Sequence, residues 1–271
     1  MSGIEFNAWL LALAGIAVVS ILAWAISLPI RNVSFVDSLW SLFFLLAAAI
    51  YAYSADTLGI PALVLVLLVA LWAIRLAAHI GYRNWGEDED HRYQKIRENN
   101  QPFWIKSLYI VFGLQGFLAW IISLPLLVGT LRTTEFGWVH VVATGLWTIG
   151  FLFEAVGDWQ LLHFKSDPDN AGKVLDTGLW RYTRHPNYFG EFCIWWAYFL
   201  FALAAGGWWT IISPLLMSVL LLKVSGVSML ESTIEERRPK YAGYIKRTNA
   251  FFPGPPKKSG GVAQQHSEVS S

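Results

Sequence analysis

Charged residues are scarce in this chain. Only 14% of its 271 residues are Asp, Glu, Lys or Arg, whereas 55% are hydrophobic. Soluble globular domains carry about 25% charged residues, so this composition indicates a protein that crosses a membrane several times. The net charge is only +1, which excludes the strong positive field of a nucleic-acid-binding protein. A single cysteine, Cys193, excludes an intramolecular disulfide framework.

Familiar ligand motifs are missing from the sequence as well. It has no Gly-rich phosphate loop of the Rossmann or Walker type. No two histidines lie within one helical turn and Cys193 has no cysteine partner, so we expect no metal site. Any chemistry must come from polar residues that lie inside apolar segments or at their ends.

The apolar residues form long runs, and a bilayer needs about 20 such residues for each spanning helix. The sequence therefore predicts an all-α polytopic membrane protein with seven transmembrane helices. The fifth and seventh are short, which predicts tilt or irregular ends. The expected spans are residues 8–28, 36–53, 60–80, 108–128, 138–153, 188–204 and 208–223.

The positions of lysine and arginine test this count, because cytosolic loops are enriched in both. With the N-terminus outside, all but two of the 20 lysines and arginines fall on cytosolic pieces. The exceptions are Arg132, in an outside loop, and Arg75, within the third span. An even number of spans would destroy this segregation. We therefore expect the N-terminus outside and the C-terminus in the cytosol, with the chemistry on the cytosolic side.

We expect one transmembrane domain over residues 1–253, of which residues 158–253 form a cofactor-binding part. Residues 254–271 are rich in Pro, Gly and Ser, which predicts a disordered tail. Glu5 is the only charged residue before the first span, and a signal peptide would need a positive leader. The first span is therefore expected to be retained. The membrane is expected to be a bacterial inner membrane, or the endoplasmic reticulum in a eukaryote.

The densest group of polar side chains, GLWRYTRHPNYFGE at 178–191, directly precedes the sixth span. Ionisable groups at this depth are costly and indicate a functional site. The planar fork of arginine suits phosphate, and histidine adds a hydrogen-bond donor or a proton switch. Asn187 and Glu191 are four residues apart and share a helical face, where a ligand carboxamide would suit both. The alternative is a lipid anchor, with Arg181 and Arg184 at the headgroups and Trp180 in an aromatic belt.

Two further stretches carry polar residues at helical spacing. Glu154, Asp158 and Lys165 share a face of a helix that continues the fifth span, until SDPDNAG at 166–172 breaks it. This face would form ion pairs or point into a site. After the seventh span, Glu231 and Arg238 precede a tyrosine-rich stretch. That tail either closes a pocket or lies as an amphipathic helix on an anionic membrane.

Polar residues inside the spans complete the inventory. Asp37 begins the second span, either as an N-cap or as a proton donor to a substrate. Arg75 and His79 are four residues apart in the third span, and Arg75 has the alternative of extending toward the nearby helix end. The acid run 87–90 is typical of a solvated loop, although its neighbours Trp85, Arg92 and Tyr93 are placed to cap the cytosolic mouth.

The motifs now described carry a family resemblance. GLWRYTRHPNYFGE resembles the C-terminal block of the sterol Δ14-reductases and the steroid 5-alpha-reductases. With the VDxxW beginning of the second span and the RRPxYxxY tail, the chain is similar to bacterial membrane proteins classed with the 5-alpha-reductase C-terminal domain. More distantly, it resembles isoprenylcysteine carboxyl methyltransferase, which has a similar RHPxYxG block.

The resemblance implies NADPH as cofactor, held between the cytosolic loops and the last helices. Asn187 and Glu191 would hold the nicotinamide carboxamide, and three basic residues of the same block would lie along the phosphates. The implied cofactor site comprises Asp158, Lys165, Trp180, Arg181, Tyr182, Arg184, His185, Asn187, Tyr188, Glu191, Glu231, Arg238, Tyr241 and Tyr244.

The chain departs from the steroid 5-alpha-reductases in the second helix, where they carry a Gln-Glu pair that activates the enone together with a tyrosine. No such pair occurs here, and Asp37 is the nearest acid. We therefore expect Asp37 to polarise the substrate, with His79 or Arg75 as support. Glu191 would orient the nicotinamide or relay the proton.

The sequence thus predicts an integral membrane oxidoreductase that transfers a hydride from NADPH to an activated C=C of a steroid-, sterol- or isoprenoid-like substrate. Its expected partners are that lipophilic substrate and membrane lipids. One alternative is an S-adenosylmethionine-dependent membrane methyltransferase, and another is a non-catalytic lipid-binding protein. Asn187 favours the reductase, because the methyltransferases usually lack asparagine before this tyrosine.

Overall fold

The computed structural model describes residues 1–224 and 241–257, and every regular element in them is helical. Five helical segments are long and apolar enough to cross a membrane, which is consistent with an integral membrane protein. These segments are α1 (Gly3–Ile30), α2 (Val36–Tyr53), α3 (Ile60–Arg83), the stretch Phe103–Ile122, and α8 (Trp138–Ser166).

The fourth of these segments is irregular and ends in a break. It begins earlier than the span predicted at 108–128, and it stops at Ser123 within that span. Pro125 follows directly and lacks the N–H that a continuous helical ladder would require. Ser123 lies fully buried at the break, where its hydroxyl meets the Tyr51 hydroxyl at 2.7 Å. The elements here are α5 (Phe103–Ser107), η1 (Leu108–Gly113), α6 (Leu114–Ile122) and α7 (Leu124–Leu131).

The last two predicted spans correspond to α9 (Pro186–Ala204) and to the shorter apolar segment Trp208–Lys223. Asn187 and Glu191 lie in the first turns of α9 and make it more polar than the five long segments. The seven-span count and the orientation therefore stay predictions. The short segment comprises η4 (Trp208–Ile211), α10 (Ile212–Val219) and η5 (Leu220–Val224).

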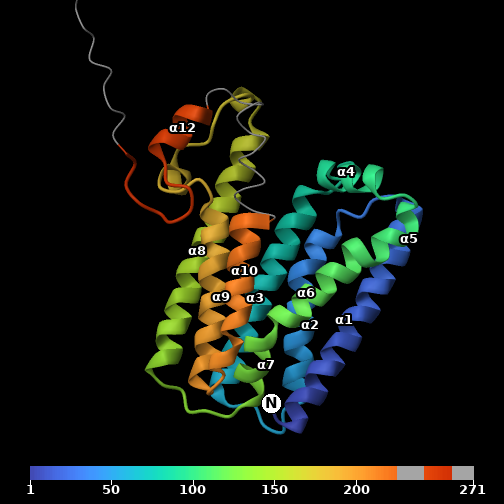
Figure 1. Ribbon diagram of the computed structural model, residues 1–271. Coiled ribbons are helices and arrows are strands. Elements are labelled where there is room, and N and C mark those ends of the chain that lie inside the picture. Colours follow the sequence, from blue (N-terminus) through green and yellow to red (C-terminus); the bar gives the residue numbers. More distant parts are fainter. Residues whose placement is uncertain (225–240, 258–271) are drawn as a thin grey trace, which may run out of the picture.

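The long helices run side by side, and the N-terminus lies at one end of the bundle (Figure 1). At the opposite end lie α4 (His91–Asn99), α12 (Tyr241–Arg247) and the C-terminal end of α8. The connection between α8 and α9 also lies at that end and contains η2 (Pro168–Asn170) and η3 (Gly178–Arg181). The residues expected to bind a ligand thus gather at one end of the bundle.

An aromatic core joins α2, α3 and α9 below that end. Trp72, Trp195 and Tyr198 are fully buried. The Trp72 and Trp195 rings meet edge to face with centroids 5.8 Å apart, and those of Trp195 and Tyr198 are 5.4 Å apart. Phe44 of α2 approaches Trp195 to 4.6 Å. Edge-to-face pairs of this kind add stability beyond their buried area, so this core fixes α3 against α9.

Arg132, the arginine expected in an outside loop, is paired at the N-terminal end of the bundle. Its Nε donates to Glu5 Oε1 at 2.6 Å, and its Nη1 donates to the Ala205 carbonyl at 3.3 Å. Glu5 is buried and forms a capping box with Ser2 at the start of α1. The Arg132 side chain therefore ties α1 to the ends of α7 and α9.

Candidate polar site between α3, α8 and α9

A buried ion-pair group links α3 to α8. Arg75 Nη2 lies 2.5 Å from Glu154 Oε1, and Arg75 Nη1 donates to Asp158 Oδ2 at 2.6 Å. Glu154 and Asp158 are only 2% and 7% exposed, and their spacing of four residues places both on one face of α8. Trp72, one turn before Arg75, donates its indole N–H to Glu154 Oε2 at 3.1 Å. Arg75 thus pairs across the bundle instead of extending toward its helix end.

Two more residues bring polar atoms to the same carboxylate of α8. Asn187, at the start of α9, donates its amide to Asp158 Oδ1 at 3.2 Å. His79 Nε2 lies 3.8 Å from Asp158 Oδ2. Residues that the sequence assigned to catalysis and residues that it assigned to cofactor binding therefore meet at Asp158.

Glu191 is the exception in this group. It lies one turn after Asn187, and no hydrogen bond or ion pair joins its carboxylate to another residue in the described ranges. The charges of Arg75, Asp158 and Glu154 nevertheless act on it. Three carboxylates thus share one arginine at this depth. An ionisable group in such a position indicates a ligand or a proton partner.

Glycines create this geometry by allowing α8 and α9 to touch. A Cβ on Gly150 would lie 2.6 Å from the Gly190 carbonyl oxygen, and a Cβ on Gly190 would clash with the Gly150 carbonyl. One turn toward the site, a Cβ on Gly157 would lie 3.1 Å from the Pro186 ring. Backbones in direct contact bring the polar faces of both helices within hydrogen-bonding distance.

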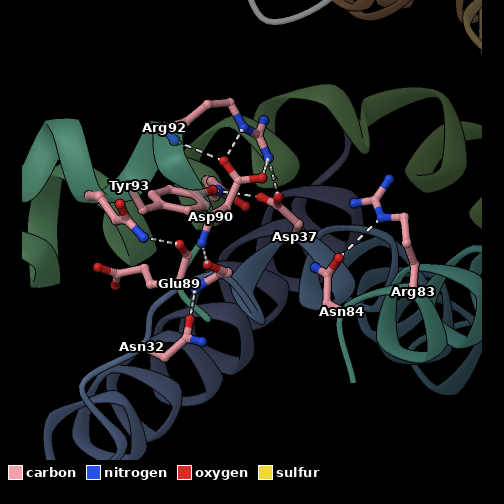
Figure 2. Close-up of polar contacts among 11 residues, drawn as sticks. Asn32, Asp37, Arg83, Asn84, Glu89, Asp90, Arg92 and Tyr93 are labelled. Atoms are coloured by element: carbon pink, nitrogen blue, oxygen red, sulfur yellow. Dashed lines mark hydrogen bonds and ion pairs between the residues drawn. The ribbon is translucent and has the colours of Figure 1, made fainter. Parts of the chain in front are cut away.

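Asp37 lies in a second polar group, at the end of α2 that faces α4 (Figure 2). The Tyr93 hydroxyl donates to Asp37 Oδ1 at 2.5 Å, and Arg92 Nη2 donates to Asp37 Oδ2 at 2.7 Å. Gln115 donates to the Tyr93 hydroxyl at 3.0 Å. Both carboxylate oxygens of the expected polarising acid are thus engaged by α4.

Asp90 caps α4 and holds it in place. Its carboxylate accepts from the Arg92 backbone N–H at 2.8 Å and from Arg92 Nε at 3.0 Å. Burial alone would raise the pKa of Asp90, but these hydrogen bonds and the Arg92 charge outweigh it, so the pKa is lower than usual. Burial, together with the Asp37 charge, raises the pKa of Tyr93 above its ordinary value. Tyr93 therefore remains a neutral hydrogen-bond donor at neutral pH.

The acid run 87–90 divides into two halves. Glu87 and Asp88 are exposed, as a solvated loop predicts. Glu89 instead accepts from the Val33 backbone N–H at 3.0 Å and binds Arg97 through two hydrogen bonds of 2.8 and 2.7 Å. The solvated-loop interpretation is wrong for the second half of the run, because this half fastens α4 to the connection between α1 and α2.

Tyr188 lies between the two polar groups. The charges of Glu191 and Asp158 act on its hydroxyl, and so do those of Arg92 and Arg83. Arg83 and Asp37 lie close to one another in Figure 2. Arg83 is eight residues after Arg75, which places it about 12 Å further along α3 at 1.5 Å per residue. The two groups are therefore separate but belong to the same end of the bundle.

The basic residues expected along the phosphates divide into exposed and engaged ones. Arg181 is exposed, whereas Arg184 is 7% exposed. Arg184 Nη1 donates to the carbonyls of Ile245 at 3.1 Å and of Thr248 at 2.7 Å, and so caps the C-terminal end of α12. Arg184 thus holds the C-terminal segment in place.

The remaining residues of the expected cofactor site surround this connection. Trp180 donates its indole N–H to the Gly157 carbonyl at 3.1 Å, and the buried Tyr244 hydroxyl donates to the Trp180 carbonyl. The Tyr241 ring meets Tyr244 with centroids 5.3 Å apart. His185 is buried and stacks on Tyr188, while Tyr182 and Lys165 are exposed. Glu231 and Arg238 lie outside the described residues.

Comparison with known proteins places the chain in a family. A family described as "Protein of unknown function (DUF1295)" matches residues 23–248, which is most of the chain. The chain belongs to this family. It is also similar to "Uncharacterized protein C594.04c" of Schizosaccharomyces pombe, at 27% identity over 263 residues, covering 85% of this chain and 75% of the relative. No solved structure matches. The resemblance to steroid 5-alpha-reductases therefore stays a prediction.

Sequence reasoning did not assign Glu154, Trp72 or Gln115 to the site. Glu154 had a signal, because it is an acid one turn before Asp158 and near the end of an apolar run. Trp72 and Gln115 had little, since a tryptophan or a glutamine in a membrane helix is common without a ligand. Only the packing of α3 against α8 and of α4 against α6 assigns them a partner.

Proposed function

We propose that this protein is an integral membrane oxidoreductase that uses NADPH to reduce an activated C=C of a lipophilic substrate taken from the bilayer. The observation that carries the proposal is the unpaired Glu191 carboxylate beside Asn187, within the polar group of α3, α8 and α9. A carboxylate acceptor and an amide one turn apart suit a primary carboxamide. The proposed location is a bacterial inner membrane or the endoplasmic reticulum.

The residues present fit the nicotinamide end of the cofactor better than its phosphate end. Asn187 and Glu191 would hold the carboxamide, and NADPH, when bound, would supply the hydride. At the phosphate end, Arg181 is exposed and available to an anion. Arg184 is engaged in capping α12, so its proposed role is to position this segment.

The charge balance of the site adds a second argument. Glu154, Asp158 and Glu191 face one arginine, so the group favours a positively charged ligand atom beside it. Such an environment stabilises the oxidised, cationic nicotinamide relative to the reduced one. The carboxylates of this chain would thereby promote hydride donation.

The second polar group would act on the substrate. Tyr93 remains protonated at neutral pH and shares its proton with Asp37. A substrate oxygen that replaced Asp37 as acceptor would receive a donor where negative charge develops during reduction. Asp37 would then position Tyr93 and Arg92 rather than act alone, which deepens the role that the sequence suggested for it.

The same charge balance supports one alternative. S-adenosylmethionine carries a sulfonium cation, which three carboxylates beside one arginine would also favour. A membrane methyltransferase is therefore the second candidate function. A lipid-binding protein without catalysis is the third, and it would need neither cofactor.

Ligand-dependent thermal unfolding separates these functions. Protein purified in detergent would be heated with NADPH, NADH or S-adenosylmethionine, since a ligand at one hundred times its dissociation constant adds about 2.7 kcal/mol of stability. We expect stabilisation by NADPH that falls about tenfold in affinity in Glu191→Gln and in Asn187→Ala. Glu98→Gln, an exposed neutralisation on α4, is the matched control and should respond like the parent. Stabilisation by S-adenosylmethionine alone would refute the reductase.

A further inference from the structure

A second cavity lies away from the polar site, between α1 and α5 at the end of the bundle that carries α4. Its volume is about 190 Å³. Its lining combines basic, hydroxyl and aromatic side chains with apolar ones, and these residues are Ser27, Arg31, Arg97, Phe103, Trp104 and Ser107 together with Leu28 and Val33. We call it the α1–α5 cavity.

Arg31 supplies the charge of this cavity. Its side chain is exposed, and no described residue forms a hydrogen bond or an ion pair with its guanidinium. Its backbone lies in the left-handed region with φ of 50° at the C-cap of α1, a position that favours glycine. A non-glycine residue held there is strained, and strain of this kind is found at ligand-binding positions.

Arg97 has a different role, because its charge is already compensated. It binds Glu89 through two hydrogen bonds, and its guanidinium lies 4.2 Å from the Phe103 ring centroid. It also donates to the Arg31 carbonyl at 3.3 Å. Arg97 thus fixes the backbone of Arg31 and leaves one uncompensated positive charge in the cavity.

The surroundings of the cavity are those of a membrane interface. Trp104 is 58% exposed, while its carbonyl accepts from the Trp24 indole N–H at 2.8 Å and so joins α5 to α1. Ile30 and Ile105 beside the cavity are exposed apolar residues. Tryptophan with exposed aliphatic side chains is typical of the level where headgroups meet acyl chains.

We propose that the α1–α5 cavity binds the phosphodiester headgroup of an anionic phospholipid, with Arg31 as its ligand. The planar guanidinium of arginine matches two phosphate oxygens. Exposed apolar residues on α1 and α5 would accommodate the acyl chains, which a free phosphate ion does not have. This binding site is separate from the proposed cofactor site and does not depend on the reductase function.

The test compares lipid binding by native mass spectrometry of the full chain in neutral detergent, with phosphatidylglycerol, phosphatidylcholine and inorganic phosphate as probes. We expect phosphatidylglycerol to bind more tightly than the other two. Arg31→Gln should weaken phosphatidylglycerol about fivefold, as expected for one basic residue at an anionic lipid. Lys95→Gln removes the same charge from an exposed position on α4 and should leave the affinity unchanged.

A second variant guards against a loss of folding. Arg31→Gly removes the side chain but suits the left-handed backbone, so it should fold and still lose the preference for phosphatidylglycerol. Equal losses in Arg31→Gln and Lys95→Gln would overturn the site in favour of general surface attraction. Equal binding of both lipids would overturn it too, and so would competition by inorganic phosphate at the affinity of the lipid.

Discussion

Replacing Arg75 by glutamine should strongly destabilise this protein. Arg75 compensates two carboxylates, at 2.5 Å from Glu154 and 2.6 Å from Asp158. Their side chains are 3% and 9% exposed, and that of Arg75 is 19% exposed. Arg75→Gln keeps most of the volume but leaves both carboxylates without their cation. Stability should fall because buried charge without a partner is unfavourable.

Breaking a buried ion pair from one side costs about 3–5 kcal/mol. A chain of this size loses about 2–4 °C in melting temperature per kcal/mol, so we expect a fall of about 6–20 °C in detergent. Arg83→Gln is the control on the same helix. Arg83 is exposed and donates only to its neighbour Asn84, so this change should cost less than about 0.5 kcal/mol.

Neutralising the carboxylates separates charge from packing. In Arg75→Gln with Glu154→Gln and Asp158→Asn, no uncompensated charge remains at these positions, so most of the lost stability should return. Thermal unfolding of the four proteins in one detergent measures the effect. The reasoning is refuted if Arg75→Gln costs less than about 1 kcal/mol, or if the triple variant is less stable than the single one.

Three further changes test other parts of the structure. Gly190→Ala should cost about 1–3 kcal/mol by separating α8 from α9, whereas Gly145→Ala, with nothing within 4 Å of the added Cβ, should be neutral in the same melting assay. Arg184→Ala should expose residues 241–257 to trypsin, and equal protection in Arg184→Ala and Arg181→Ala would contradict its capping role. Asp90 has a lowered pKa, so it stabilises α4 above its usual pKa of about 3.9, and this contribution is lost as the pH falls through the lowered value. Pepsin should therefore cut α4 more readily toward pH 2 in the parent, while Asp90→Asn should lose the pH dependence.

Long apolar runs allow much of the bundle to be predicted from sequence. The bounds expected for the second span agree with α2 (Val36–Tyr53), and the break expected at 166–172 follows the end of α8 at Ser166. The break at Ser123 was missed, because Leu124 and the residues after it stay apolar and composition does not distinguish a kinked helix from a straight one.

The polar site was predicted only as separate pieces. Helical spacing correctly paired Glu154 with Asp158, and Asn187 with Glu191, on their own helices. Spacing within one helix does not determine which helices pack together, so the contact of Arg75 with α8 could not be derived. That contact depends on glycine-mediated packing of α8 on α9 and on the aromatic core beside it.

The function of arginine was the hardest property to read from the sequence. In a motif of alternating basic and aromatic residues, an anion-binding arginine and a capping arginine look the same. Arg184 became distinguishable only when the carbonyl groups of Ile245 and Thr248 were located, 61 and 64 residues further along the chain. Arg31 was assigned only to a cytosolic loop, because its sequence position does not reveal its left-handed backbone.

Hydride transfer itself tests the central proposal most directly. Purified protein would be incubated with total membrane lipid and NADPH that carries deuterium at the transferable position, followed by mass spectrometry of the lipids. The account predicts a reduced lipid that contains one deuterium, formed by the parent but not by Glu191→Gln. Deuterium absent from every lipid, with a methyl group from labelled S-adenosylmethionine incorporated instead, would contradict it.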